Sequence, residues 1–266
     1  MRVIDCGRLL LLAALWGASF LFMRITTPAF GAVNSAFQRV LFAAVALGLL
    51  AGARGKWGGY EGKFIATLKL GVINSGLPFL MYCLAAQWLP AGYSATLNAT
   101  APMMGVLIGA LCFAEPLTLR KGAGAALGAI GVAVIARPTT GLEAERVALG
   151  SQIGATLFLC PFFLWSCGHG LAVDWGQGLP WMAMLMLGVV CTAAGYILYF
   201  RLIADIGPLR SLSVTFLIPP FAVLWGYLFL GEIVESGLIL GALLVCLALW
   251  MMVVPSGRKE RVPGGA

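Results

Sequence analysis

Prolines within long apolar segments are the first residues whose type and position could support chemistry. Pro102 and Pro219 each lie near the middle of such a segment. Proline has no backbone N–H, so each removes the helical hydrogen bond to a carbonyl four residues earlier, that of Asn98 and that of Thr215. A carbonyl freed at membrane depth must be satisfied by protein, water or a ligand. We expect these positions, together with Thr100, to line a binding site; kinks used only for helix packing are the alternative.

A second pair of helix-weakening residues occurs in the segments that precede these two. Pro78 frees the carbonyl of Asn74, and the equivalent residue 117 positions later is Gly195. Tyr82 and Tyr199 follow four residues after them, which places each on the same helix face one turn away. A tyrosine offers an apolar ring and one hydroxyl, which suits a small amphiphilic molecule. The alternative is that these tyrosines lie at the membrane–water interface.

Arg39 is a charged residue within an apolar segment, about 12 Å from its start at about 1.5 Å per residue. A central arginine costs about 2.5–3.5 kcal/mol on insertion scales, so we expect Arg39 to face the interior of the bundle. There it could bind a substrate carboxylate or phosphate, whereas snorkelling or an internal ion pair would be structural. Trp16 precedes Gly17, a combination that allows close helix approach beside a bulky ring.

The candidate substrate-binding residues are therefore polar, aromatic or helix-breaking residues in apolar segments: Trp16, Arg39, Asn74, Tyr82, Asn98, Thr100, Pro102, Gln152, Tyr196, Tyr199, Thr215 and Pro219. Glu115 and Glu232 end equivalent segments and are candidates for coupling, because burial raises a carboxyl pKa toward the working range. For Glu115, which precedes Arg120 and Lys121, a boundary ion pair or helix-end contact is the alternative, whereas Glu232 has no nearby base in sequence. The seven cysteines are scattered and read as small core residues. We expect no catalytic residue, cofactor or metal site, and no enzyme activity.

The elements that position these residues follow from composition. Hydrophobic residues make up 61% of the 266 residues and charged residues 10%, which is typical of a polytopic membrane protein rather than a soluble domain. A spanning helix needs about 20 apolar residues. Nine such segments are predicted, at about 8–27, 31–52, 66–88, 92–113, 119–136, 148–168, 182–204, 209–230 and 234–254. The predicted fold is all-α.

An internal repeat organises these segments. Residues 71–127 match residues 188–244 without a gap at a constant offset, 188 minus 71 being 117, and the matches include Pro102/Pro219, Tyr82/Tyr199 and Glu115/Glu232. Two related halves are typical of secondary transporters, whose substrate site lies between the repeats. We predict a first repeat at 1–137, a second at 138–254 and a polar tail at 255–266.

The second half is one helix short. At the same offset Trp16 would correspond to residue 133, which lies within the first half. Aligning Gln38 with Gln152 makes 148–168 the partner of the second helix and leaves the first helix without a partner. Five crossings from an internal Arg8 put residues 138–147 outside, whereas the basic tail requires 148–168 to begin inside. Either the chain lacks a helix, or 148–168 does not cross fully.

The net charge of +7 is explained by loops. The basic residues concentrate near 54–69, 120–121, 201–210 and 258–261, which the positive-inside rule places in the cytoplasm. We expect an integral protein of a bacterial inner (plasma) membrane with a cytoplasmic C-terminus. Its partners would be the lipid bilayer and a small-molecule substrate, not nucleic acid. The small-residue spacing of Gly124 and Gly128 favours close packing or a homodimer.

Three stretches resemble the drug/metabolite transporter superfamily, and within it the EamA-type permeases. They are LWGASFLFMRI at 15–25, FAEPLT at 113–118 and LGVVCTAAGYILYFRLIADIGPLRSLSVTFLIPPFAVLWGYLFLGE at 187–232. The resemblance implies two inverted five-helix repeats, with the equivalent of the sixth helix missing here. It also implies a permease that exports amino acids, metabolites or toxic compounds.

Three functional hypotheses remain from the sequence. The first is a secondary permease for a small polar metabolite or amino acid, working by alternating access, in the direction of efflux. The second is an inactive or structural membrane protein that lost one helix of the transporter fold. An intramembrane enzyme is the weakest, because no Ser/His, paired-Asp or metal-ligand constellation falls within the helices. No nucleotide-binding motif such as GxxxxGK[ST] is found in the sequence, which disfavours ATP-driven transport by this chain alone.

Overall fold

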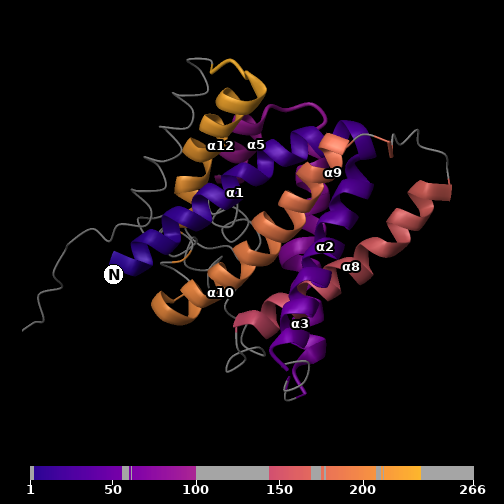
Figure 1. Ribbon diagram of the computed structural model, residues 1–266, viewed down its shortest axis with the longest axis vertical. Helices are drawn as coiled ribbons and strands as arrows, with labels where there is room; N and C mark the ends of the chain where they lie inside the picture. The colour runs from indigo at the N-terminus through magenta and orange to yellow at the C-terminus, as the bar shows by residue number, and fades with distance from the viewer. Residues whose placement is uncertain are drawn as a thin grey trace, which may run out of the picture.

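The computed structural model describes residues 3–55, 60, 62–99, 144–168, 175–176, 178–207, 211 and 213–234. Every regular element within these ranges is helical (Figure 1). The elements are α1 (Val3–Phe30), α2 (Ala32–Ala53), α3 (Phe64–Gly71), η1 (Val72–Gly76), α4 (Leu77–Ala85), α5 (Ala91–Ala99), α8 (Ala144–Gly168), α9 (Gly178–Leu185), η4 (Met186–Ala194), α10 (Gly195–Ile206) and α12 (Val214–Leu230). Here η denotes a π-helical stretch inside a continuous helix. The all-α prediction is confirmed for the part of the chain that the structure describes.

Five helices in these ranges are long and apolar enough to cross a membrane: Val3–Phe30, Ala32–Ala53, Phe64–Ala85, Ala144–Gly168 and Gly178–Ile206. The shorter apolar helix Val214–Leu230 accompanies them. These six agree with six of the nine predicted segments. The segment at 92–113 begins as α5, while the segments at 119–136 and 234–254 lie outside the described residues. The total of nine is therefore not tested.

Two π-helical stretches interrupt helices at positions that the repeat makes equivalent. Adding 117 to Val72–Gly76 gives 189–193, which lies within Met186–Ala194. A wide π turn leaves backbone carbonyls without their usual partners and occurs frequently at functional sites. In the first stretch the cause is local, because Pro78 two residues later has no N–H for the Asn74 carbonyl. The two halves thus share a helix irregularity as well as a sequence pattern.

Glycines let the helices of the two halves pack closely. A Cβ added to Gly71 would lie 1.8 Å from the carbonyl oxygen of Ser151 in α8, and one added to Gly188 would lie 2.6 Å from Cβ of Phe42 in α2. Gly71 and Gly188 are themselves repeat equivalents. The third segment of each half therefore packs on the second segment of the other. Gly17 gives α1 a similar approach to α12, because an added Cβ would lie 2.7 Å from Cβ of Phe221.

Ion pairs gather at one end of the bundle. Arg8 in α1 pairs with Asp205 in α10 at 2.7 Å, and one turn earlier in α10 Arg201 pairs with Glu145 at 2.9 Å. Glu145 also pairs with Arg54, next to the end of α2. The start of α8 therefore lies at the same end as the start of α1. Five crossings would have placed residues 138–147 at the opposite end, so that expectation is wrong for the position of Glu145.

The continuity of α8 bears on the missing helix. It runs without a break for 25 residues, which at about 1.5 Å per residue exceeds a hydrocarbon core of roughly 30 Å. Figure 1 shows α8 extending along the bundle beside α2 and α3. Its length and composition are those of a full span. Of the two alternatives, a missing helix and an incomplete crossing by residues 148–168, the length of α8 favours the missing helix.

Candidate functional site

A cavity of about 200 Å³ lies where the two halves meet. It is bordered by seven elements, α1, α2, η1, α4, α5, α10 and α12. The lining residues are Trp16, Ser19, Phe20, Arg39, Ile73, Asn74, Pro78, Phe79, Tyr82, Asn98, Tyr196, Tyr199, Thr215 and Ile218. Arg39 is the one formal charge among them. The cavity is thus a mostly aromatic chamber with amides, hydroxyls and a single cation.

Arg39 is only 2% exposed and is the largest fully buried side chain among the described residues. Its Nε donates to Oγ1 of Thr192 at 2.8 Å, and Nη1 lies 3.5 Å from the sulfur of Met23. The guanidinium carbon stands 3.6 Å from the ring centroid of Phe79, a cation–π contact. Within the described ranges no carboxylate pairs with Arg39. A buried cation held by neutral groups favours an anion in the adjacent cavity, since an uncompensated buried charge is costly.

A second set of hydrogen bonds at the cavity crosses between the halves. Gln152 Nε2 donates to Ser75 Oγ at 3.1 Å, and Ser75 donates to the Tyr196 oxygen at 2.9 Å. The Tyr196 hydroxyl in turn donates to the backbone carbonyl of Asn74 at 2.8 Å. This is the carbonyl that Pro78 leaves without a helical donor. The expected freed carbonyl exists, and a tyrosine from the other half satisfies it.

The two polar chains are equivalent by position. Ser75 and Thr192 differ by 117 residues, and each hydroxyl accepts a hydrogen bond from the second helix of the other half. The donor is Gln152 in one case and Arg39 in the other. The contacts therefore pair Arg39 with Gln152, whereas aligning Gln38 with Gln152 pairs Arg39 with Ile153. The structural pairing is displaced from that alignment by one residue.

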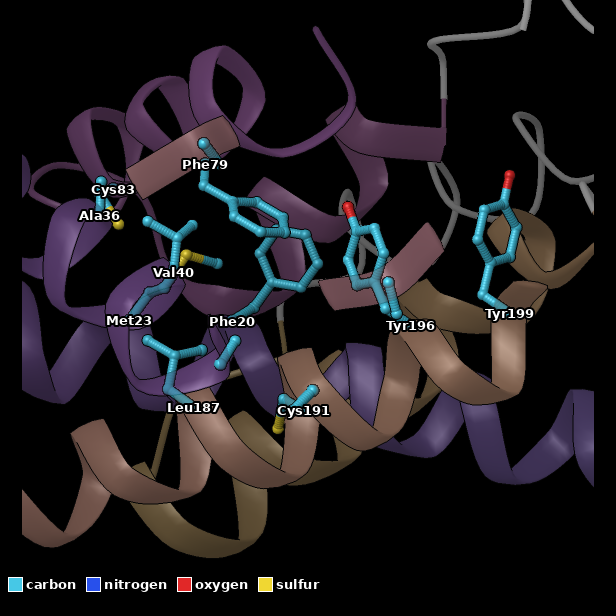
Figure 2. Packing of buried hydrophobic residues seen from close by; sticks show 14 of the residues in the cluster. Phe20, Met23, Ala36, Val40, Phe79, Cys83, Leu187, Cys191, Tyr196 and Tyr199 are labelled. Carbon is cyan, nitrogen blue, oxygen red and sulfur yellow. The ribbon is translucent and has the colours of Figure 1, made fainter. Parts of the chain in front are cut away.

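Aromatic rings from α1, α4 and α10 form the walls. Trp16 lies with its ring centroid 5.0 Å from that of Tyr199 and 5.9 Å from that of Tyr196. Gly195 makes room for this indole, because an added Cβ would lie 2.8 Å from Nε1 of Trp16. Phe79 meets Tyr196 edge to face at 6.1 Å, and Figure 2 shows these two rings approaching from different helices. Such contacts fix a rigid apolar wall.

The Tyr82 hydroxyl donates to Oδ1 of Asn98, which joins α4 to α5 at the cavity. Tyr199 is 6% exposed and Tyr196 3%. Tyr82, which is half-buried, and Tyr199 both line the cavity, as expected for tyrosines that face the interior of the bundle. Their hydroxyls and the side-chain amides of Asn74 and Asn98 supply the polar groups that the walls otherwise lack.

Eight of the twelve candidates selected from the sequence line the cavity: Trp16, Arg39, Asn74, Tyr82, Asn98, Tyr196, Tyr199 and Thr215. Gln152 does not border it and acts through Ser75 and Tyr196. Pro219 is buried in α12 but does not border it either. Thr100, Pro102 and Glu115 lie outside the described residues. Ser19, Phe20, Phe79 and three others were not selected, although Ser19 and Phe20 follow Trp16 at helical spacing on one face.

Glu232 lies away from the cavity, at the end of the bundle opposite Glu145. Its carboxylate oxygens each accept from the backbone N–H of Ala91 at 3.1 Å, and Oε1 lies 3.7 Å from Nε of Arg24. Arg24 donates to the Ala86 carbonyl at 2.9 Å. Glu232 thus caps α5 and ties α12 to α1. The basic partner of Glu232, Arg24, is distant in sequence and is brought close by the packing of α1.

A bundle of apolar helices around a cavity lined by aromatic rings and a few polar groups is typical of membrane transport proteins. The sequence pattern of the EamA-like transporter family matches residues 7–137 and 141–254. The chain belongs to this family. It is also similar to the probable terminal-alkyne amino-acid exporter of Streptantibioticus cattleyicolor, with 25% identity over 262 residues that cover 85% of each chain.

Proposed function

We propose that this transporter is a secondary-active permease that exports a small neutral amino acid, or a closely related carboxylate, by alternating access between its two halves. The cavity is the substrate site. Arg39 binds the carboxylate, and the aromatic walls contact the side chain. Residues 1–137 and 138–254 are the two repeats, inverted relative to each other, in an inner (plasma) membrane with a cytoplasmic C-terminus.

The observation that carries this proposal is the unpaired charge of Arg39. Its described neighbours Thr192, Met23 and Phe79 are all neutral. A cation in such surroundings attracts a carboxylate strongly, because the local dielectric constant is low. No Asp or Glu among the lining residues competes for it. A substrate with one negative group therefore completes the site.

Size and wall chemistry narrow the substrate further. A volume of about 200 Å³ is below the roughly 300–1,000 Å³ typical of drug-sized ligands. Trp16, Phe20, Phe79 and the tyrosines present ring faces and few charged partners. A short neutral side chain fits these walls, and an α-ammonium group can interact with ring faces and amide oxygens. The relative's name, an amino-acid exporter, supports the same substrate class and the direction of efflux.

Alternating access is supported by the paired irregularities of the two halves. The π-helical stretches occupy equivalent positions, and each contributes a hydroxyl that receives a hydrogen bond from the other half. Ion pairs close one end through Arg8, Arg54 and Glu145, and Glu232 closes the other. Rocking of one repeat against the other around a central site would break one set of contacts at a time.

Flux into proteoliposomes tests the proposal. The purified protein would be reconstituted, the vesicles preloaded with L-propargylglycine or L-leucine, and exchange of the labelled compound measured against but-3-yn-1-amine and isoamylamine, the same two molecules without the carboxylate. We expect saturable exchange of the amino acids and none of the amines. No exchange of any compound, at the same level as protein-free vesicles, would support the inactive or structural alternative instead.

A further inference from the structure

Thr192 links Arg39 to the backbone of η4 by two hydrogen bonds. Its hydroxyl accepts from Arg39 Nε at 2.8 Å and donates to the Leu187 carbonyl at 2.7 Å. Leu187 is five residues earlier, so this second bond uses a carbonyl in the π-helical stretch. The hydroxyl is therefore fixed in direction by the backbone and can present only a lone pair to the guanidinium.

The backbone on both sides is held as well. Gly188, one turn before Thr192, allows η4 to approach α2 so closely that an added Cβ would lie 3.0 Å from the Arg39 carbonyl oxygen. Phe79 covers one face of the guanidinium, with its centroid 3.6 Å from Cζ. Three contacts thus restrain Arg39: its main chain against Gly188, its Nε on Thr192 and its plane on Phe79.

These restraints decide which donors remain for a ligand. An arginine has five N–H donors in a rigid fork. Nε is occupied by Thr192, and one N–H of Nη1 points at the sulfur of Met23, a weak acceptor. The remaining donors are on the two terminal nitrogens of this side chain, and Arg39 borders the cavity. A carboxylate then binds end-on, through both terminal nitrogens.

We propose that Thr192 is the positioning and specificity-determining residue of this transporter: it holds Arg39 so that its terminal nitrogens select a carboxylate over an uncharged or basic group of the same shape. This inference rests on the proposed function, in which Arg39 binds the substrate carboxylate. Thr192 does not itself border the cavity. Its effect therefore passes through Arg39.

The repeat provides an internal contrast. At the equivalent position, Ser75 receives its hydrogen bond from uncharged Gln152 and passes it to Tyr196. One half thus positions a charge at the cavity, and the other half positions a phenol. The substrate would be oriented by this asymmetry, with its carboxylate toward α2 and η4.

The test compares binding of L-propargylglycine with binding of its amide, L-propargylglycinamide, to the purified protein by equilibrium dialysis. The variants are Thr192→Val, which removes the hydroxyl at nearly constant shape, and Thr192→Ser, which keeps it. Thr156→Val is the matched control, because Thr156 also donates to its own helix, to the Gln152 carbonyl at 2.7 Å, without contacting Arg39. Circular dichroism and size-exclusion elution verify that each variant is folded.

The wild type should prefer the acid over the amide. Thr192→Val should reduce that preference by about tenfold or more, the effect of one charge-assisted hydrogen bond, while Thr192→Ser and Thr156→Val retain it within about twofold. If Thr192→Val keeps the full preference, or if Thr192→Ser loses it equally, the positioning role is wrong while the proposed function stands. If the wild type shows no preference for the acid, the carboxylate role of Arg39 is wrong, and the inference falls with it.

Discussion

The hydroxyl of Tyr196 lies 2.8 Å from the backbone carbonyl oxygen of Asn74, across the contact between the two halves. Pro78 denies that carbonyl its helical donor, and a phenol from the other half replaces it. The same phenol lines the cavity. The irregularity in the first half is therefore satisfied by the second half, through a residue that also borders the site.

Replacing Tyr196 by phenylalanine should leave the Asn74 carbonyl buried without this donor. An unsatisfied buried acceptor costs about 1–3 kcal/mol, so the variant should unfold at a lower temperature in detergent micelles. Tyr227→Phe is the matched control, because Tyr227 is 59% exposed and its replacement should change the unfolding temperature little. Equal melting temperatures for Tyr196→Phe and the wild type would show that this hydrogen bond does not stabilise the fold.

Alanine at Gly71 or Gly188 should destabilise the protein. An added methyl group would meet the Ser151 backbone in one case and Phe42 in the other, and overpacking of this kind typically costs about 1–3 kcal/mol. Gly7→Ala in α1 has open space around it and is the control. Thermal unfolding and helix content by circular dichroism would measure the effect. Two alanine variants as stable as Gly7→Ala would contradict the close approach of the halves.

The ion pair between Glu145 and Arg54 predicts which residues share a side of the membrane. In a cysteine-free background, single cysteines at Ala53 and Ala144 should react with an impermeant maleimide from the same side, the cytoplasm. A cysteine at Gln87, which is exposed near the opposite end, should react from the other side. Labelling of positions 53 and 144 from opposite sides would overturn the placement of α8.

Charge neutralisation at Glu232 should affect the fold only modestly. Glutamine can still accept from the Ala91 N–H, and a partly exposed pair such as Arg24–Glu232 usually contributes about 1 kcal/mol or less. Glu232→Gln should therefore keep near-wild-type stability. Because Glu232 lies outside the cavity, substrate affinity measured by equilibrium dialysis should also be kept. A large loss of affinity would give Glu232 a direct part in binding.

Much of this arrangement follows from sequence because repetition constrains it. The repeat predicts four site residues from their equivalent positions, Tyr82 with Tyr199 and Asn98 with Thr215, and all four line the cavity. Arg39 was selected because a charge is expensive in an apolar helix. Composition predicts helices because an apolar chain in a membrane must pair its backbone N–H and C=O groups within each segment.

Other parts could not be predicted, because they depend on how helices meet. Phe79 and Ile218 are ordinary apolar residues, and only packing brings them to the cavity. Gln152 looked like a lining residue, but Tyr196 and Ser75 stand between it and the site. No sequence pattern marks Thr192 as a site residue, since its contact with Arg39 depends on a π-helical stretch and joins residues 153 positions apart in sequence.

The most direct test of the central claim is the effect of Arg39 on amino-acid exchange in proteoliposomes. Arg39→Gln should lower kcat/KM for L-propargylglycine by about a hundredfold or more, because the carboxylate loses its charged partner in a buried site. For Arg39→Lys, kcat/KM should lie between the values of the wild type and Arg39→Gln, since lysine keeps the charge but not the fork of donors. Lys69→Gln, which removes an exposed charge outside the cavity, should match the wild type. Exchange by Arg39→Gln at the rate of Lys69→Gln would contradict the assignment of Arg39 as the carboxylate-binding residue.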